Sequence, residues 1–184
     1  MRERLGRPVD VIQTWAHMIM LSSRLEMEAL KDFNDAVVSC ISNASPLAIG
    51  LLRLGSVPQG RVGDFHPAPA GHRKVAQDAS AYVSCQGENL AAPALRYAVW
   101  RSVACRNGSI RVCTITGISS IAELTENVEA VEKVLLLTKD TPKRVSSGCA
   151  INQAQVQKDL PMFQVVQDNL DGWEHYSLMN PEEG

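Results

Sequence analysis

The chain has 184 residues, 45% of them hydrophobic and 21% charged, which suits one soluble globular domain with its own core. A formal net charge of −2 gives no electrostatic basis for binding nucleic acid or an acidic membrane surface. Residues 1–7 are charged, without the apolar core of a signal peptide, and no apolar run reaches the roughly 20 residues of a membrane helix, so we expect a cytosolic protein.

The first elements along the chain alternate between strand and helix patterns. Residues 9–15 read as a strand. The following helix is expected to begin near Ser23, because Ser23 and Glu26 have the spacing of a capping box. Its apolar residues fall on one face: Leu25, Ala29, Leu30 and Phe33. Residues 36–41 then read as a second strand, apolar enough to be covered on both faces.

The middle of the chain opens with a loop of roughly eighteen residues after Leu52, a length typical of lids, binding loops or disordered segments. Two helices are predicted next, over residues 72–86 and 93–103, with Pro93 in the first turn of the second. A third strand follows at residues 111–116.

The last part of the chain begins with a helix from Ser120, where Glu123 again has capping-box spacing. The apolar positions predict which residues this helix buries: Ile121, Leu124, Val128, Val131 and Leu135. Turn signals at 141–142 and 146–148, a helix over 150–160 and an aromatic tail at 173–176 complete the pattern.

The cysteines predict no framework of disulfides and no metal site. They are odd in number and form no C-x-x-C pair, and four sit among apolar residues, so we expect buried, reduced thiols. They are Cys40, Cys85, Cys105, Cys113 and Cys149.

The order of the elements predicts an α/β fold built from parallel β-α-β units. The second and third strands each end in a loop of small residues, at 43–52 and 116–120, whose backbone amides we expect to be free. In a (β/α)8 barrel, the loops after the last two strands and a helix N-terminus form a phosphate site.

Five sequence motifs, taken in this order, resemble the aldo-keto reductase family, and within it the aldose 1-dehydrogenase branch of fungal D-arabinose and plant L-galactose dehydrogenases. They are Gly6 to Ile12, Trp15-Ala16-His17, Ala44 to Leu52, Phe65 to Pro69 and Gly117 to Asn127. The resemblance implies that the chain is the C-terminal part of a (β/α)8 TIM barrel, strands six to eight with their helices. Residues 1–137 would be the partial barrel domain and 138–184 a C-terminal extension of helix, loop and aromatic tail.

The resemblance also implies residues that bind a nicotinamide cofactor. Trp15 would stack on the nicotinamide, with a core or barrel-rim tryptophan as the alternative. The pyrophosphate would lie against the first loop, and the adenosine against the second, where the structural alternatives are an ordinary turn and a solvated helix face. The first loop contributes Ser45, Pro46, Leu47 and Gly50; the second contributes Gly117, Ile118, Ser119 and Ser120, with Glu126 and Asn127 at the adenine.

Glu123 stands where NADP-preferring members of the family carry an arginine for the 2′-phosphate. A carboxylate repels a phosphate and offers no donors to it, so the resemblance implies NAD, with NADP as the alternative cofactor. Glu123 is equally explained as the capping partner of Ser120, and the two roles are compatible.

The Asp, Tyr, Lys and His of the family's catalytic tetrad belong to strands one to four, and no segment of this chain matches them. We therefore expect an NAD(P)-dependent oxidation of an aldose at C1 to the lactone, with this chain supplying the cofactor-binding half and no catalytic residue. The alternative is a non-catalytic remnant or partner-binding fragment that associates with itself through exposed strand edges. Six aliphatic residues would lose cover in an open barrel: Val9, Val11, Val37, Ile41, Val112 and Ile115.

Overall fold

A computed structural model describes residues 6–57, 60–61, 64–105, 110–136, 150–170, 172–174 and 176–178. Strands and helices alternate through most of these residues, as predicted. In chain order the elements are β1 (Val11–Trp15), η1 (Leu25–Ala29), α2 (Leu30–Asp35), β2 (Cys40–Ala44), η2 (Ala48–Gly50), α3 (Ala70–Cys85), α4 (Ala91–Ala104), β3 (Arg111–Ile115), α5 (Ile121–Val134) and α6 (Gln153–Asp168). No helix among the described residues is both long and apolar enough to cross a membrane.

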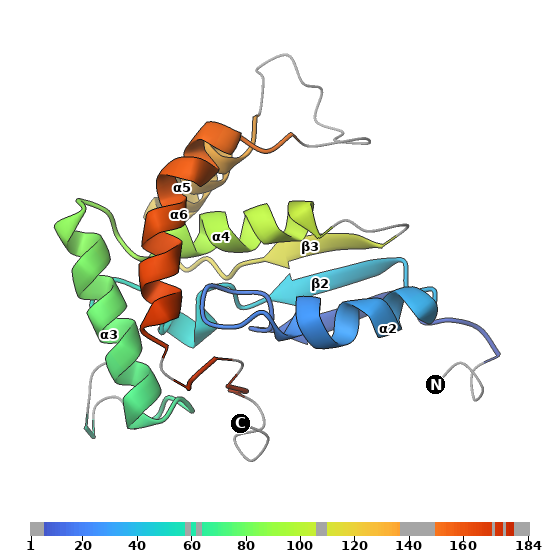
Figure 1. Ribbon diagram of the computed structural model, residues 1–184, viewed down its shortest axis with the longest axis horizontal. Coiled ribbons are helices and arrows are strands. Elements are labelled where there is room, and N and C mark those ends of the chain that lie inside the picture. Colours follow the sequence, from blue (N-terminus) through green and yellow to red (C-terminus); the bar gives the residue numbers. More distant parts are fainter. Residues whose placement is uncertain are drawn as a thin grey trace.

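Three parallel strands form a sheet in the order β1-β2-β3. Trp15 pairs with Ala44, and Ala44 with Ile115, so the strands end together at one edge. Spatial order follows chain order, as it does in a (β/α)8 barrel, and the fold is consistent with part of such a barrel. The numbering of these strands as six to eight stays a prediction. Figure 1 shows α2 and α4 running along the sheet, and α3 and α6 standing beyond the carboxyl ends of the strands.

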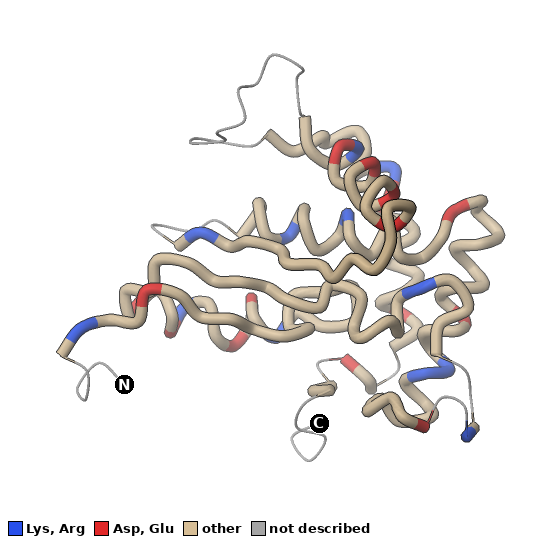
Figure 2. The backbone as a smooth tube through the Cα atoms, turned by 180° about the vertical axis from the view of Figure 1, so that it is seen from behind, with Lys and Arg blue, Asp and Glu red and all other residues tan. Residues whose placement is uncertain are grey.

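One face of the sheet is covered and the other is open. Ile41 and Val112 are buried in a cluster with Leu25, under the helices. On the opposite face Val11 and Ile115 are 56% and 46% exposed, and Figure 2 shows no helix crossing it. Within β2, Cys40 and Ser42 are only half-buried on this face, so the prediction that β2 is covered on both faces is wrong. Successive side chains of a strand point to opposite faces. Of the residues expected to lose cover, Ile41 and Val112 therefore stay buried under the helices, whereas Val11 and Ile115 are exposed.

β2 begins at Cys40, four residues after the predicted start. The residues before it form the cap that ends α2, in which the amide of Val38 donates to the carbonyl of Phe33. Val37 has a left-handed backbone in this cap, with φ 61°. Val38 and Phe33 also belong to the same apolar cluster. The β-branched run therefore closes a helix instead of starting a strand.

The capping box predicted at Ser23 does not form. The helix after β1 starts as a π-helical turn without a side-chain cap. Glu26 instead accepts two hydrogen bonds from Arg101 of α4 and one from the Cys105 thiol. A bidentate charged pair is stronger than a hydrogen bond to a single amide, which explains the outcome. Burial and the Glu26 carboxylate raise the pKa of Cys105 to about 12, so this thiol stays protonated.

α5 does not bury the stripe of residues predicted for it. Ile121, Leu124 and Val128 are 83%, 45% and 46% exposed, whereas Ala130 and Val134 are buried. The helix packs against α4 in a cluster that holds these two residues, with Val131 and Leu135 partly buried beside it. The small side chain of Ala130 lets the helices approach closely, and the large aliphatic residues of the first turns remain on the outside.

α6 continues past the predicted end at residue 160, through Pro161. Proline inside a helix costs about 3 kcal/mol, yet the next two turns still form. They carry Phe163 and Val166, which lie buried in the core with residues of α3 and α4. Apolar burial of that kind, about 1.5–3 kcal/mol for each side chain, offsets the proline. The turn signals predicted at 141–142 and 146–148 lie outside the described residues.

Candidate nucleotide-binding site

The two small-residue loops lie side by side at the carboxyl edge of the sheet. One follows β2 and the other joins β3 to α5, and adjacent parallel strands bring such loops together. The sequence predicts that the Ser45–Gly50 loop lies close to the Gly117–Asn127 segment, which includes the first turns of α5. Both segments line the same pair of pockets.

The loop after β2 folds into a tight 3-10 turn whose amides are bonded internally. The amides of Ala48 and Gly50 donate to carbonyls within the loop, and the amide of Ile49 donates to the Ser45 hydroxyl at 3.1 Å. Leu51 and Leu52 donate back in the same way. The expectation that these amides are free is wrong, because the turn satisfies them itself.

His66 fixes this turn from the long loop that follows it. Its Nε2 lies 3.1 Å from the carbonyl oxygen of Ala48, and its Nδ1 accepts the amide of Ala68 at 3.0 Å. Since Nδ1 accepts, the proton sits on Nε2. Burial, with the charge of Arg73, lowers the pKa of His66 although the Ala48 carbonyl raises it, so the ring is neutral at physiological pH. Val57 and Ala68 are also buried, which anchors the described parts of this loop to the core.

The second loop leads into the N-terminus of α5, which Ser120 caps as predicted. The Ser120 hydroxyl accepts the amide of Glu123 at 3.1 Å. The Glu123 carboxylate turns back to Ser119, accepting its amide at 2.7 Å and its hydroxyl at 2.8 Å. These hydrogen bonds, and the nearby Arg53, hold the pKa of Glu123 below its usual range, so it is ionised at neutral pH.

Two adjoining pockets occupy the space between the loops. The loop pocket, of about 310 Å³, is lined by Ser45, Pro46, Leu47, Ile49, Gly50, Arg53, Thr116 and Gly117. The helix pocket, of about 190 Å³, is lined by Leu47, Arg53, Leu54, Asn89, Ala91, Gly117, Glu123, Glu126 and Asn127. Leu47, Arg53 and Gly117 line both, so the two pockets adjoin, and together they are called the groove.

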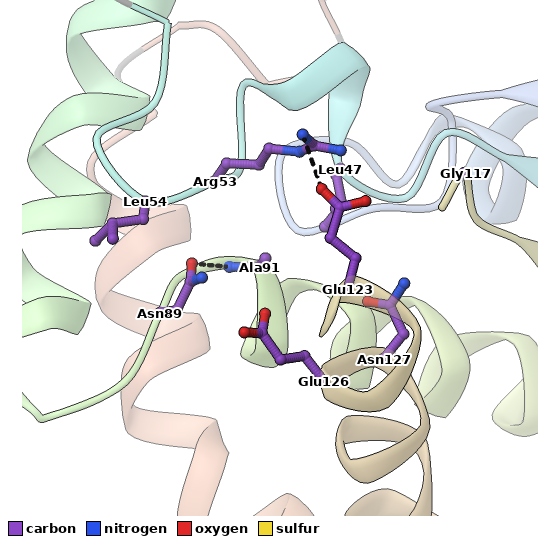
Figure 3. A pocket seen from close by; sticks show the side chains of 9 residues that line it. All are labelled: Leu47, Arg53, Leu54, Asn89, Ala91, Gly117, Glu123, Glu126 and Asn127. Atoms are coloured by element: carbon purple, nitrogen blue, oxygen red, sulfur yellow. Dashed lines mark hydrogen bonds and ion pairs between the residues drawn. The ribbon is translucent and has the colours of Figure 1, made fainter. Parts of the chain in front are cut away.

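An arginine that the sequence analysis did not select spans this groove. In Figure 3 Arg53 and Glu123 point toward each other across the helix pocket. Arg53 Nη1 lies 3.5 Å from Glu123 Oε1, and the two side chains are 48% and 31% exposed. The groove thus combines a cation, an ionised carboxylate and the polar ends of Glu126 and Asn127, groups suited to a ligand with both phosphate and hydrogen-bonding parts.

Most of the predicted site residues line the groove, and four do not. Those outside both pockets are Trp15, Ile118, Ser119 and Ser120. Trp15 is half-buried against the core cluster beyond the strand ends. Ser119 and Ser120 instead position Glu123 and the helix N-terminus. The roles assigned to all these residues stay predictions.

The pocket-lining residues that the sequence analysis did not select are Ile49, Arg53, Leu54, Asn89, Ala91 and Thr116. Arg53 directly follows the small-residue loop, and a search for the cation absent from position 123 would have found it. Asn89 precedes α4 and belongs to no sequence motif, so no signal in the sequence points to it. Its side-chain oxygen accepts a hydrogen bond from the amide of Ala91 at 3.1 Å.

The four cysteines that the structure describes form no disulfide with one another, and contrary to the prediction none of them is fully buried. Cys40 and Cys105 are half-buried, while Cys85 and Cys113 are exposed. Cys40 and Cys113 lie on the open face of the sheet with their sulfurs 3.9 Å apart, and Cys149 is outside the described residues. Nowhere in the described part of the chain do three or more His, Cys, Asp or Glu side chains gather as a metal site requires.

Comparison with known proteins places the chain in a family. The family model described as "Aldo/keto reductase family" matches residues 1–147. The chain belongs to the aldo/keto reductase family. Its members are oxidoreductases that generally use NAD(P)H.

The chain is also similar to the L-galactose dehydrogenase of Arabidopsis thaliana. The two are 31% identical over 132 residues, which is 72% of this chain. The same alignment covers 37% of the length of that relative. Helix α6 lies beyond the part that the family model matches, although it supplies core residues such as Phe163.

Proposed function

We propose that this chain forms the cofactor-binding part of an NAD-dependent oxidoreductase that oxidises an aldose at C1 to the lactone. The proposal is supported by one observation above the others: the loop after β2 and the N-terminus of α5 line two pockets that adjoin. The substrate class comes from the resemblance to L-galactose dehydrogenase. The proposal assigns cofactor-binding residues to this chain and no member of the family's catalytic tetrad.

The groove fits the chemical parts of a dinucleotide. Glu126 and Asn127 border the helix pocket and offer an acceptor and an amide to the adenine edge. Gly117 faces open space where a Cβ would stand, so the backbone permits a close approach at the junction of the pockets. The amides of Ile121 and Ala122, in the first turn of α5, have no acceptor among the described residues and favour an anion.

When bound, the nicotinamide cofactor would accept a hydride from C1 of the sugar, while the C1 hydroxyl gives its proton to a base of the catalytic tetrad. The residues of this chain would bind and orient the cofactor. Ser45, through its hydroxyl, and His66, through the Ala48 carbonyl, hold the turn after β2 in shape. A rigid turn keeps the position of the bound dinucleotide fixed, which a transfer over a few ångströms requires.

The preference for NAD over NADP rests on the charge of Glu123. Its carboxylate is ionised and occupies the amide and the hydroxyl of Ser119, which a 2′-phosphate would otherwise use. A free ribose 2′-hydroxyl can donate to that carboxylate, whereas a phosphate is repelled by it.

We expect the wild-type protein to bind NAD at least tenfold more tightly than NADP in calorimetric titrations. The substitution Glu123→Arg should reverse this order, because up to two charge-assisted hydrogen bonds replace a repulsion. Glu132→Arg makes the same change of charge on α5 outside the pockets and should leave the ratio of the two dissociation constants within twofold. Equal or tighter binding of NADP by the wild type would remove Glu123 as the determinant.

The open sheet face favours a second candidate, a non-catalytic fragment that associates with a second copy of itself. Val11 and Ile115 are exposed on this face, and Ile118, Ile121 and Leu124 are further exposed apolar residues, in the loop before α5 and on α5. Exposed strand edges and apolar faces favour association. We expect the isolated 184-residue protein to sediment as an oligomer and to show no reduction of NAD with D-arabinose or L-galactose. A monodisperse monomer with turnover above background would contradict both expectations.

A further inference from the structure

Arg53 lies at the junction of the two pockets, where the phosphates of a dinucleotide that fills the groove would lie. It lines the loop pocket and the helix pocket alike, whereas Glu123 borders only the second and Gly50 only the first. A ligand whose adenosine occupies the helix pocket and whose remainder occupies the loop pocket must pass Arg53.

The loop after β2 offers few free backbone amides to an anion. The amides from Ala48 to Leu52 all donate within the turn, so they are not available to phosphate oxygens. Backbone amides usually supply much of the attraction in a phosphate-binding loop. Beside the amides of Ile121 and Ala122 at the start of α5, a side-chain cation is the remaining source of attraction for a phosphate, and Arg53 is the arginine that lines both pockets.

The ion pair that Arg53 makes in the free protein is weak enough to be exchanged. The distance of 3.5 Å to Glu123 is too long for a strong charge-assisted hydrogen bond, and both side chains are partly exposed. Glu123 also has a second set of partners, since its Oε2 is held by Ser119. The carboxylate therefore stays satisfied when the guanidinium turns to another anion.

The stem of Arg53 is held over the turn. A Cβ built on Gly50 would lie 3.6 Å from Arg53 Cδ and 3.8 Å from its Nε. Gly50 also has a φ of +90°, which a side chain rarely adopts. The two distances are ordinary contact distances, so the aliphatic stem lies against the turn, and the half-exposed guanidinium faces Glu123.

We propose that Arg53 binds the pyrophosphate of the dinucleotide, and that Glu123 holds it at the junction of the pockets until the ligand arrives. This inference rests on the proposed function of the groove. Arginine suits the role, since its planar fork can give two hydrogen bonds to one phosphate group.

The test is calorimetric titration of the 184-residue protein with adenosine, AMP and ADP-ribose. We expect Arg53→Met to weaken binding of ADP-ribose tenfold or more and to change binding of adenosine less than twofold. Arg53→Lys should recover part of the loss, because it restores the charge without the fork. The wild-type affinity for ADP-ribose should also fall between 50 and 300 mM NaCl, and that of Arg53→Met should not.

Arg111→Met is the matched control, since Arg111 is an exposed arginine at the other end of β3. It should leave all three affinities within twofold. If Arg53→Met weakens adenosine and ADP-ribose equally, or weakens neither, the assignment of Arg53 is wrong while the groove remains a nucleotide site. If the wild type binds neither adenosine nor ADP-ribose, the proposed function fails, and this inference fails with it. If Arg53→Met loses its native circular dichroism, the test rests on the Arg53→Lys titration and on the salt dependence of the wild type. Unchanged ADP-ribose affinity in both measurements would then contradict the proposal.

Discussion

Replacing Arg96 with methionine is expected to lower the free energy of unfolding by about 3–5 kcal/mol, since it strands a buried carboxylate. Arg96 is fully buried and binds Asp159 of α6 through two hydrogen bonds, of 2.6 and 2.9 Å, and Glu88 through one of 2.7 Å. Asp159 is itself 3% exposed and would keep only the amide of Gln155 as a partner. Urea denaturation at pH 7 measures the loss.

Two further variants separate a stranded charge from lost packing. Arg96→Met combined with Asp159→Leu removes both members of the pair, and we expect it to recover most of the stability. Arg7→Met breaks an ion pair whose members are 71% and 70% exposed, and should cost less than about 1 kcal/mol. A double variant as unstable as Arg96→Met alone would show that packing, not charge, joins α4 to α6.

Lowering the pH from 7 to 4 is expected to destabilise the protein by up to about 3 kcal/mol through His72 alone. Burial, with a smaller effect of His66, lowers the pKa of His72 to about 4. The ring stacks on Trp173 at 5.7 Å and meets Tyr176 edge-on at 5.4 Å. Neither ring nitrogen has a hydrogen-bond partner among the described residues.

The sign follows from comparing the two states. The unfolded chain binds a proton on this histidine below about pH 6.5, while the folded protein resists it down to about pH 4. Stability is therefore complete above pH 6.5, falls through that window and levels off below it. His72→Phe keeps a ring against Trp173 and should remove most of this slope in denaturation curves recorded at pH 7 and 4.5. Burial also lowers the pKa of His17, but without the large shift of His72, so His17→Gln should keep most of the slope. An unchanged slope in His72→Phe would assign the acid sensitivity to other groups.

The same aromatic contact explains why the C-terminal residues belong to the fold. Trp173 lies so close to α3 that a Cβ on Gly71 would meet its ring at 2.5 Å. Together with the pair of Arg96 and Asp159, this contact ties the segment after residue 150 to the helices before it. The assignment of residues 138–184 as an extension of the partial barrel stays a prediction, but the described part of that segment completes the core.

The sequence by itself determined the family, the parallel order of the strands and the two loops that line the groove. These features depend on local signals: β-branched runs, the small residues that follow two strands, and the Ser120 cap, which forms with its neighbour Glu123 as the spacing predicts. Local signals succeed where the partners lie within a few residues of each other.

Only the tertiary structure decided which amides, charges and faces are used. The apolar stripe on α5 remains exposed because α4 approaches the small Ala130 instead. Ser23 loses its predicted capping partner because Arg101, 75 residues further along the chain, binds Glu26. Arg53 meets Glu123 for the same reason: two loops distant in sequence are joined at one edge of a sheet. In such pairs, residues far apart in the sequence compete for the same side chain, and the spacing of residues along the chain does not predict which partner wins.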